Sequence, residues 1–221
     1  MVERITNHPR LAYYTHAPAI GKVMDSFFEG HSDPEKRKKY YEDVLRSSFD
    51  FRELSWPYLN PLEHLRLILE DAWPAGAVRE NIHGKPMGLG LAQLFKEGAC
   101  AFPHQDFLRM DEPENQRAQT LITQVTALVY VKPADAGGKL ELWADHYTHE
   151  QFMARRNTER YGLDYTKIPP PSVIITPGKG ELVMADSTKV HAVTAIESGI
   201  RIGINCFIGF RGISEPLSFW S

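Results

Sequence analysis

The sequence predicts a mainly β protein with flanking helices, in which a double-stranded β-helix (jelly-roll) core follows an α-helical N-terminal region. Three observations predict this fold. The first third of the chain carries apolar residues at helical spacing, the chain from residue 88 carries short apolar runs broken by Gly, Pro and Asp, and these runs number eight. Eight short antiparallel strands suit a jelly roll.

The first 87 residues are expected to form a helical support for the β core. Ser32 or Asp33 can cap a helix that begins at Pro34, and apolar residues follow at helical spacing. A second helix is expected from Pro61 to Ala72, because leucine and isoleucine side chains recur there on roughly one face.

The β pattern begins at residue 88 and ends near residue 212. Between residues 144 and 171 it lapses into a charged, aromatic segment, which we interpret as a helical insertion or lid. Residues 213–221 form a C-terminal tail, and the 221 residues suit a single domain. The expected strands span residues 89–95, 100–104, 121–131, 138–143, 172–176, 181–185, 190–195 and 200–209.

The composition is typical of a soluble globular protein, with 43% hydrophobic and 24% charged residues. The net charge is −3, and 25 Lys and Arg are scattered among 28 Asp and Glu, which disfavours nucleic-acid binding. No apolar run approaches the ~18 residues of a membrane span, no secretory signal follows the charged N-terminus, and Cys100 and Cys206 cannot build a disulfide framework. We therefore expect a cytoplasmic protein without a membrane partner, and the sequence allows a homodimer.

Two candidate metal ligands, His104 and Asp106, lie two residues apart in an extended segment, so both point to the same face of a strand. A third, His191, lies among strand-forming residues much further along the chain. Two histidines and one carboxylate form the facial triad of non-haem iron(II) oxygenases, which leaves coordination positions open. A His-x-Asp triplet alone is common on solvated loops, so only the residues that accompany it can identify it as part of a metal site. His146 and His149 lack a third ligand and are interpreted as surface residues.

Arg201 follows ten residues after His191, at the start of an apolar strand where an unpaired arginine would be costly to bury. A bound carboxylate would offset that cost through a two-pronged, charge-assisted hydrogen bond, which suits the distal carboxylate of 2-oxoglutarate. The alternative is an ion pair with a local acid such as Glu197.

Four motifs follow one another between Gln93 and Gly212. In chain order they are Phe95-x-x-Gly98 leading into His104-x-Asp106, Val129-Tyr130-Val131 leading into Gly137-Gly138-Lys139-Leu140, Pro177-Gly178-Lys179-Gly180-Glu181-Leu182-Val183, and His191-Ala192-Val193-Thr194 leading into Ser198-Gly199-x-Arg201. In order and spacing they resemble the catalytic core of the prolyl 4-hydroxylase-like branch of the iron(II)/2-oxoglutarate dioxygenases, over about half the chain. Two positions depart from the family pattern: Phe95 stands where tyrosine is frequent, and Arg201 where collagen-type enzymes use lysine.

The resemblance implies an enzyme that uses Fe(II), the co-substrate 2-oxoglutarate and O₂. Tyr130 and Thr126, at even spacing on one strand, look like the family's positions that face 2-oxoglutarate, and Gln93 shares a strand face with Phe95. The alternative for these residues is ordinary packing in the β core.

Three residues are candidates for contact with the substrate. Asn205 lies four residues beyond Arg201 on the same strand face, and a buried asparagine needs several hydrogen-bond partners. Arg109 follows the ligand pair, and Trp143 ends the strand that begins near Gly138. A solvated arginine and a packed tryptophan are the alternatives.

The reaction implied is hydroxylation of an unactivated C–H bond, coupled to decarboxylation of 2-oxoglutarate. Asp106 argues against halogenation, because a halide would need the coordination position that the carboxylate fills. We expect a small-molecule substrate, either a free amino acid or a natural-product intermediate. One alternative is a peptidyl (prolyl-type) hydroxylase, and another is a cupin-like metal- or ligand-binding protein without oxygen chemistry, which would leave Arg201 without a role.

Overall fold

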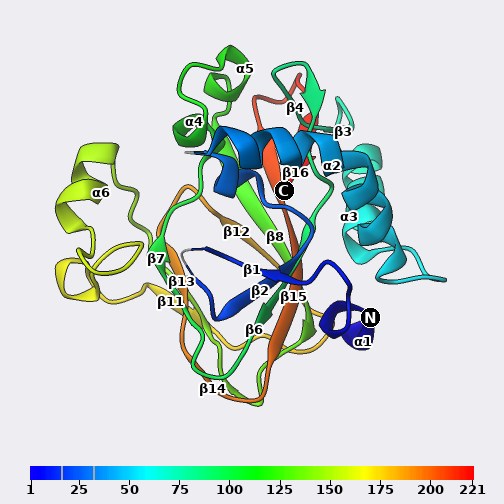
Figure 1. The fold of residues 1–221 in the computed structure, drawn as a ribbon. Helices are drawn as coiled ribbons and strands as arrows, with labels where there is room; N and C mark the ends of the chain where they lie inside the picture. The colour runs from blue at the N-terminus through cyan, green and yellow to red at the C-terminus, as the bar shows by residue number, and fades with distance from the viewer. Residues whose placement is uncertain (16, 32) are drawn as a thin grey trace.

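The computed structural model describes residues 1–15, 17–31 and 33–221. Antiparallel sheets flanked by helices make up the fold, which confirms the predicted mainly β class (Figure 1). In the larger sheet the order is β1-β2-β6-β15-β16-β3, and β8 pairs with both β15 and β12. These strands are β1 (Ala12–Tyr13), β2 (Ile20–Val23), β3 (Ala77–Arg79), β6 (Leu91–Phe95), β8 (Thr123–Lys132), β12 (Leu182–Asp186), β15 (Arg201–Phe210) and β16 (Leu217–Trp220).

The smaller sheet faces the larger one and follows the order β11-β10-β13-β7. Its strands are β7 (Ala101–His104), β10 (Leu140–Leu142), β11 (Val173–Ile175) and β13 (His191–Val193). Two short ribbons add β9 (Ala136–Gly137) to β14 (Ile196–Ser198) and β4 (Asn81–Ile82) to β5 (Lys85–Pro86).

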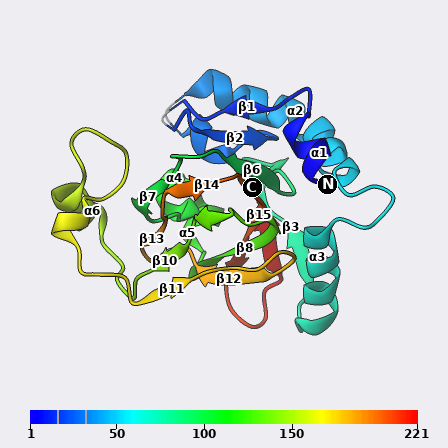
Figure 2. The ribbon, with the colours of Figure 1, turned by 90° about the horizontal axis from the view of Figure 1, so that it is seen from below.

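The central strand β15 separates the hydrophobic core from the space between the sheets. Ile202, Ile204 and Ile208 are buried in a cluster with side chains from α1 (Val2–Thr6), α2 (Pro34–Glu53) and α3 (Pro61–Ala72). In Figures 1 and 2, α1 and α3 lie on the opposite side of β8 and β15 from β7 and β13. Because side chains alternate along a strand, Arg201 points to the other face, toward the smaller sheet. Its register partner Phe95 packs there against side chains of the smaller sheet.

The N-terminal region contains the two expected helices but is not purely helical. Helix α2 begins at Pro34, and the Asp33 side chain accepts hydrogen bonds from two backbone amides of the first turn. The other predicted cap, Ser32, lies outside the described residues. The expectation of helical support alone was wrong, because this region also contributes β1 to β5. Strands this short carry too few residues for an alternating pattern, and β2 forms by pairing with β6.

Every strand expected from residue 88 onward is present, with ends that shift by at most two residues. The segment 144–171 contains α6 (His149–Arg155) and the 3₁₀ helix η2 (Tyr165–Lys167), while α4 (Leu108–Asp111), α5 (Gln116–Gln119) and the 3₁₀ helix η1 (Phe27–Gly30) complete the elements. The segment expected as a tail carries β16, which pairs with β15 and β3. Among the helices of the described residues, none combines the length and apolarity needed to cross a bilayer.

Candidate functional site

His104, Asp106 and His191 come together between the two sheets. His104 and His191 are register partners on the neighbouring strands β7 and β13, and their ring centroids lie 4.3 Å apart. The Oδ2 atom of Asp106 lies 3.7 Å from Nε2 of His104 and 3.4 Å from Nε2 of His191. One donor atom from each residue lies within 4.8 Å of the others, and no other such group of His, Cys, Asp and Glu occurs in the described parts of the chain. Strand pairing therefore assembles the predicted triad.

Both imidazoles are oriented by backbone carbonyls. Nδ1 of His104 lies 2.7 Å from the carbonyl oxygen of Phe102, and Nδ1 of His191 lies 3.0 Å from that of Lys189. A carbonyl can only accept, so each Nδ1 donates its hydrogen and each Nε2 keeps a lone pair directed at the space beside Asp106. This arrangement is the one that metal-binding histidines commonly adopt.

The charges of the triad suit a cation. Burial raises the pKa of Asp106, but the two histidines outweigh it and hold that pKa below its ordinary value. Burial also lowers the pKa of His104, and neighbouring His191 adds to this effect. Burial lowers the pKa of His191 too, but the hydrogen bond and the negative charge of Asp106 outweigh burial, so the pKa of His191 is raised above its ordinary value. A divalent metal bound at the three donor atoms would provide the positive charge that the Asp106 carboxylate favours. The donor set, two imidazole nitrogens and a carboxylate, fits iron(II).

Arg201 lies in the same interior and is only 2% exposed. Its Nη2 donates a 3.2 Å hydrogen bond to the hydroxyl of Tyr130, and the guanidinium lies over the rings of Phe95 and Tyr130 at 4.7 and 4.9 Å. Its Nε finds no hydrogen-bond partner among the described residues, and the alternative ion pair with Glu197 is not formed. The site thus contains a buried cation with unused donor capacity.

The other candidates for ligand contact fall into two groups. Asn205, Thr126 and Gln93 line the inner face of the larger sheet, with Asn205 opposite Leu128 and Gln93 opposite Gly203. The Asn205 Oδ1 atom is buried without a hydrogen-bond partner in the described residues, whereas Gln93 donates to the hydroxyl of Tyr14 at 3.1 Å.

Arg109 and Trp143 are both engaged with the protein itself. Arg109 donates to the carbonyl of Leu121 at 3.2 Å and lies over the Phe107 ring. Trp143 is 3% exposed, and its indole donates to the carbonyl of Pro169 at 2.6 Å. The exposed Arg109 and the buried Trp143 match the alternatives of a solvated arginine and a packed tryptophan.

Two further residues lie near the triad: Gln105, which sequence reasoning missed, and Tyr161, one of the aromatic residues of the predicted lid. The Gln105 side chain accepts from the backbone amide of Tyr147 at 3.0 Å and donates to the carbonyl of Thr188 at 2.8 Å. Tyr161 lies edge-on to His104 at 6.2 Å between ring centroids, and its hydroxyl accepts from the Phe102 amide. Strand alternation predicts that Gln105 points away from the ligands, and Tyr161 belongs to the charged, aromatic segment 144–171.

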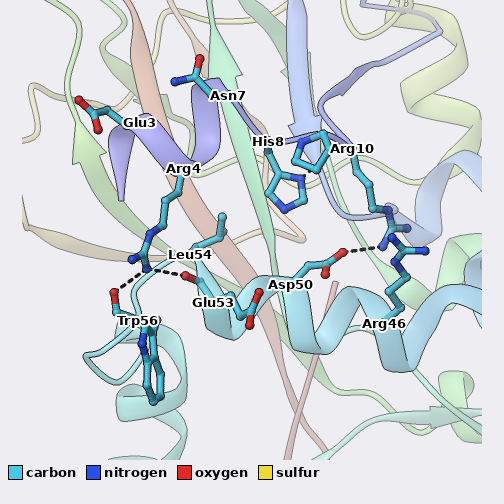
Figure 3. Close-up of a pocket in the computed structure, with 11 residues that line it drawn as sticks. Glu3, Arg4, Asn7, His8, Arg10, Arg46, Asp50, Glu53, Leu54 and Trp56 are labelled. Atoms are coloured by element: carbon cyan, nitrogen blue, oxygen red, sulfur yellow. Dashed lines mark hydrogen bonds and ion pairs between the residues drawn. The ribbon is translucent and has the colours of Figure 1, made fainter.

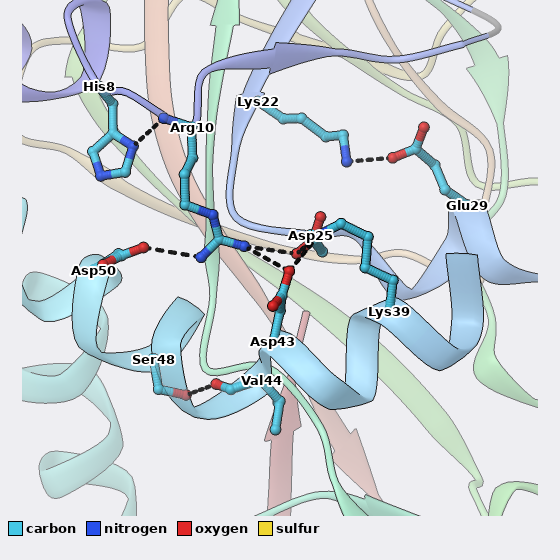
Figure 4. A network of polar contacts seen from close by, with 10 residues as sticks. All are labelled: His8, Arg10, Lys22, Asp25, Glu29, Lys39, Asp43, Val44, Ser48 and Asp50. Carbon is cyan, nitrogen blue, oxygen red and sulfur yellow. Dashed lines mark hydrogen bonds and ion pairs between the residues drawn. The ribbon is translucent and has the colours of Figure 1, made fainter. Parts of the chain in front are cut away.

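A separate groove of about 580 Å³ lies between α1 and α2 (Figure 3). Ion pairs organise this region: the Arg10 guanidinium binds the carboxylates of Asp25, Asp43 and Asp50 at 2.9–3.2 Å (Figure 4). Residues of the N-terminal segment and of the C-terminal half of α2 line the groove, and none of the predicted site residues is among them.

Comparisons with known proteins agree with this geometry. A sequence model of the 2OG-Fe(II) oxygenase superfamily matches residues 90–209, more than half of the chain. The crystal structure of an N-substituted L-amino acid dioxygenase from Burkholderia ambifaria AMMD shares the fold, with a TM-score of 0.56 and 13% identity over 92% of this chain and 86% of that chain. The same enzyme in complex with alpha-KG gives a TM-score of 0.57 with the same identity and coverage. No curated protein sequence matches the chain.

The matched region contains the triad, Arg201 and the strands from β6 to β14. The chain therefore belongs to the 2OG-Fe(II) oxygenase superfamily and is a 2-oxoglutarate-dependent non-haem iron oxygenase.

Proposed function

We propose that the protein hydroxylates a C–H bond of a small molecule at an iron(II) ion held by His104, Asp106 and His191 inside a double-stranded β-helix. The observation that carries this proposal is the convergence of the three donor atoms within 4.8 Å. Iron(II) with 2-oxoglutarate and O₂ supplies the oxidising equivalent, with succinate and carbon dioxide as the other products. The protein holds the ligands, positions the target bond and excludes water.

Arg201 is proposed to bind the distal carboxylate of 2-oxoglutarate. The free Nε and the buried guanidinium supply the charge-assisted donors that a carboxylate requires. Tyr130, which already contacts Arg201, and Thr126 and Gln93 on the same inner face are proposed to complete the pocket. A cupin-like binding protein would have no use for a buried cation so placed.

A free amino acid or a related natural-product intermediate is the proposed substrate class. The fold shared with the N-substituted L-amino acid dioxygenase supports it. The unpartnered Oδ1 of Asn205 offers an acceptor for a substrate N–H or O–H group. Arg109 and Trp143 would join the substrate pocket only after leaving their present backbone partners. A peptidyl residue is the second candidate.

The insertion, residues 144–171, is proposed to cover the substrate. Its ends are already packed: Trp143, Tyr147 and Leu163 are buried with Val190 and Ala192. Helix α6, by contrast, contributes no buried residue. The proposed movement therefore concerns α6 and the residues up to 161, hinged on packed ends.

The test combines an anaerobic and an aerobic measurement. Iron(II) with 2-oxoglutarate should give the visible charge-transfer band of the chelate, and succinate release should rise with one member of a panel of free and N-substituted L-amino acids. His191→Ala should lose both signals, whereas His64→Ala, which changes an exposed histidine of α3 outside the site and the insertion, should keep them. A wild-type protein without the band would refute the proposed iron and 2-oxoglutarate site.

A further inference from the structure

Lys22 places a second buried cation on the inner face of the larger sheet. In the pairing of β2 with β6, Lys22 lies opposite Gln93 and Ile20 lies opposite Phe95. Ile20 and Phe95 pack together in the cluster that faces the smaller sheet. Since residues two apart on a strand share a face, Lys22 also faces the space between the sheets, on the same side as Arg201.

Lys22 forms a buried ion pair with Glu29 of η1. Its Nζ lies 2.5 Å from Oε2 of Glu29, with side-chain exposures of 9% and 10%, and both side chains are drawn in Figure 4. Withdrawing two charges from water costs several kcal/mol per ion, and apolar residues of similar size often replace such a pair without loss of stability. A structural role alone therefore gives little reason for charges at this position.

Tyr14 connects this pair to the candidate active site. The Lys22 ammonium lies 5.5 Å from the centre of the Tyr14 ring, and the Tyr14 hydroxyl accepts the 3.1 Å hydrogen bond from Gln93. Burial raises the pKa of the Tyr14 phenol, and the negative charges of Glu29 and Asp106 raise it further. The phenol thus lies within the electrostatic reach of both the ion pair and a proposed iron ligand.

The segment that carries Glu29 also spans the site. Helix η1 follows β2, and the His31 ring just beyond it bonds through Nδ1 to the backbone carbonyl of Asp111, at 2.9 Å. Asp111 ends α4, the short helix that follows the predicted ligand Asp106. The chain from Lys22 to His31 therefore runs from β2 to the end of α4, a few residues beyond Asp106.

We propose that Lys22 and Glu29 form a subsite for the charged head of a zwitterionic α-amino acid, in which Lys22 binds the carboxylate, Glu29 binds the ammonium group and Tyr14 forms the wall on the side of the iron. A zwitterion carries its two opposite charges on adjacent groups, so it can join a Lys–Glu pair as two further ion pairs without adding net charge. This inference rests on the proposed function and names the part of the substrate that the enzyme recognises.

The test uses the full-length iron-loaded enzyme and the amino acid from the panel that best stimulates succinate release. Lys22→Met and Glu29→Gln should each raise the KM for that amino acid at least ~30-fold, the effect of losing one charged hydrogen-bond partner. The affinity for 2-oxoglutarate, measured from the charge-transfer band, should not change. Removal of either charge from the ligand, as the primary amide or the deaminated acid, should weaken binding to wild type by a similar factor.

Two variants separate recognition from stability. Lys36→Met is the matched control, because Lys36 is half exposed and lies 4.0 Å from Glu29, and it should leave the KM unchanged. The charge swap of Lys22→Glu with Glu29→Lys keeps an ion pair. Relative to the single variants it should bring the melting temperature back toward the wild-type value, but it should not restore the wild-type KM.

The outcomes distinguish the two hypotheses. Absence of the charge-transfer band in the wild-type protein would refute the proposed function. If the band is present but no amino acid stimulates turnover, or if the swap or Lys22→Met keeps the wild-type KM, the subsite is refuted while the iron and 2-oxoglutarate site stands.

Discussion

Replacing Arg201 by methionine should abolish most of the affinity for 2-oxoglutarate and leave the fold intact. The guanidinium is 2% exposed, donates to Tyr130 and has an Nε without a partner in the described residues. Loss of a charged hydrogen-bonding partner of a buried carboxylate costs ~2–5 kcal/mol, a factor of at least ~30 in the dissociation constant. The apoprotein loses two contacts between the cation and aromatic rings, each worth ~0.5–2 kcal/mol, but is also relieved of an incompletely paired buried charge. Its melting temperature should therefore change little.

The assay is the shift in melting temperature caused by 2-oxoglutarate with anaerobic iron(II). At a concentration of 100 times the wild-type dissociation constant, binding stabilises the wild type by ~2.7 kcal/mol, or roughly 5–11 °C for a chain of this size. A variant that binds 100-fold more weakly gains only ~0.4 kcal/mol, a shift of about 1 °C.

Two variants calibrate this result. Tyr130→Phe removes one neutral hydroxyl. It should weaken 2-oxoglutarate binding only about fivefold, because a neutral hydrogen bond contributes ~1 kcal/mol to the binding free energy. Arg201→Lys keeps the charge but not the two-pronged geometry and should fall between Arg201→Met and wild type. An Arg201→Met protein with the wild-type shift would show that the carboxylate is bound elsewhere, with Arg109 the next candidate.

Three further predictions concern the metal, the stability of the fold and the insertion. His191→Ala should abolish iron binding and succinate formation, and wild-type iron affinity in this variant would disprove the triad. Glu80→Ala should cost ~3–5 kcal/mol in urea unfolding, because Glu80 is fully buried and its carboxylate binds Arg211 at 2.8 Å. Burial acts to raise the pKa of Glu80, but its hydrogen-bond and ion-pair partners outweigh burial and hold that pKa below the ordinary value. The stabilisation should therefore be present at neutral pH and disappear as the pH falls through the folded-state pKa. A stability difference between wild type and Glu80→Ala that persists in strong acid would contradict the ion-pair explanation. In hydrogen exchange, the amide of Leu163, bonded to the Pro103 carbonyl at 2.7 Å, should exchange slowly with or without substrate, whereas α6 should gain protection only with iron, 2-oxoglutarate and substrate. Equal protection of α6 in both states would rule out a gating role.

The sequence alone determined the elements and the chemistry that depend on local patterns. The helices that begin at Pro34 and Pro61 and the eight strands expected between residues 89 and 209 were predictable, because hydrophobic periodicity is a property of consecutive residues. The ligand pair His104 and Asp106 followed from strand alternation for the same reason. His191 and Arg201 were identified by their positions in apolar, strand-forming segments, and the motifs around them also resemble those of a known family.

The tertiary structure decided what lies next to these residues. Strands β1 and β2 are too short to show a period. Strand β2 forms by pairing with β6, and β1 forms by pairing with β2. Hydrogen bonds join Tyr14 to Gln93 and Gln105 to Tyr147, although the residues of each pair are dozens of positions apart in the chain. Such contacts leave no periodic trace in a single sequence, because they depend on how strands and loops pack in space and not on the identity of neighbouring residues in the chain.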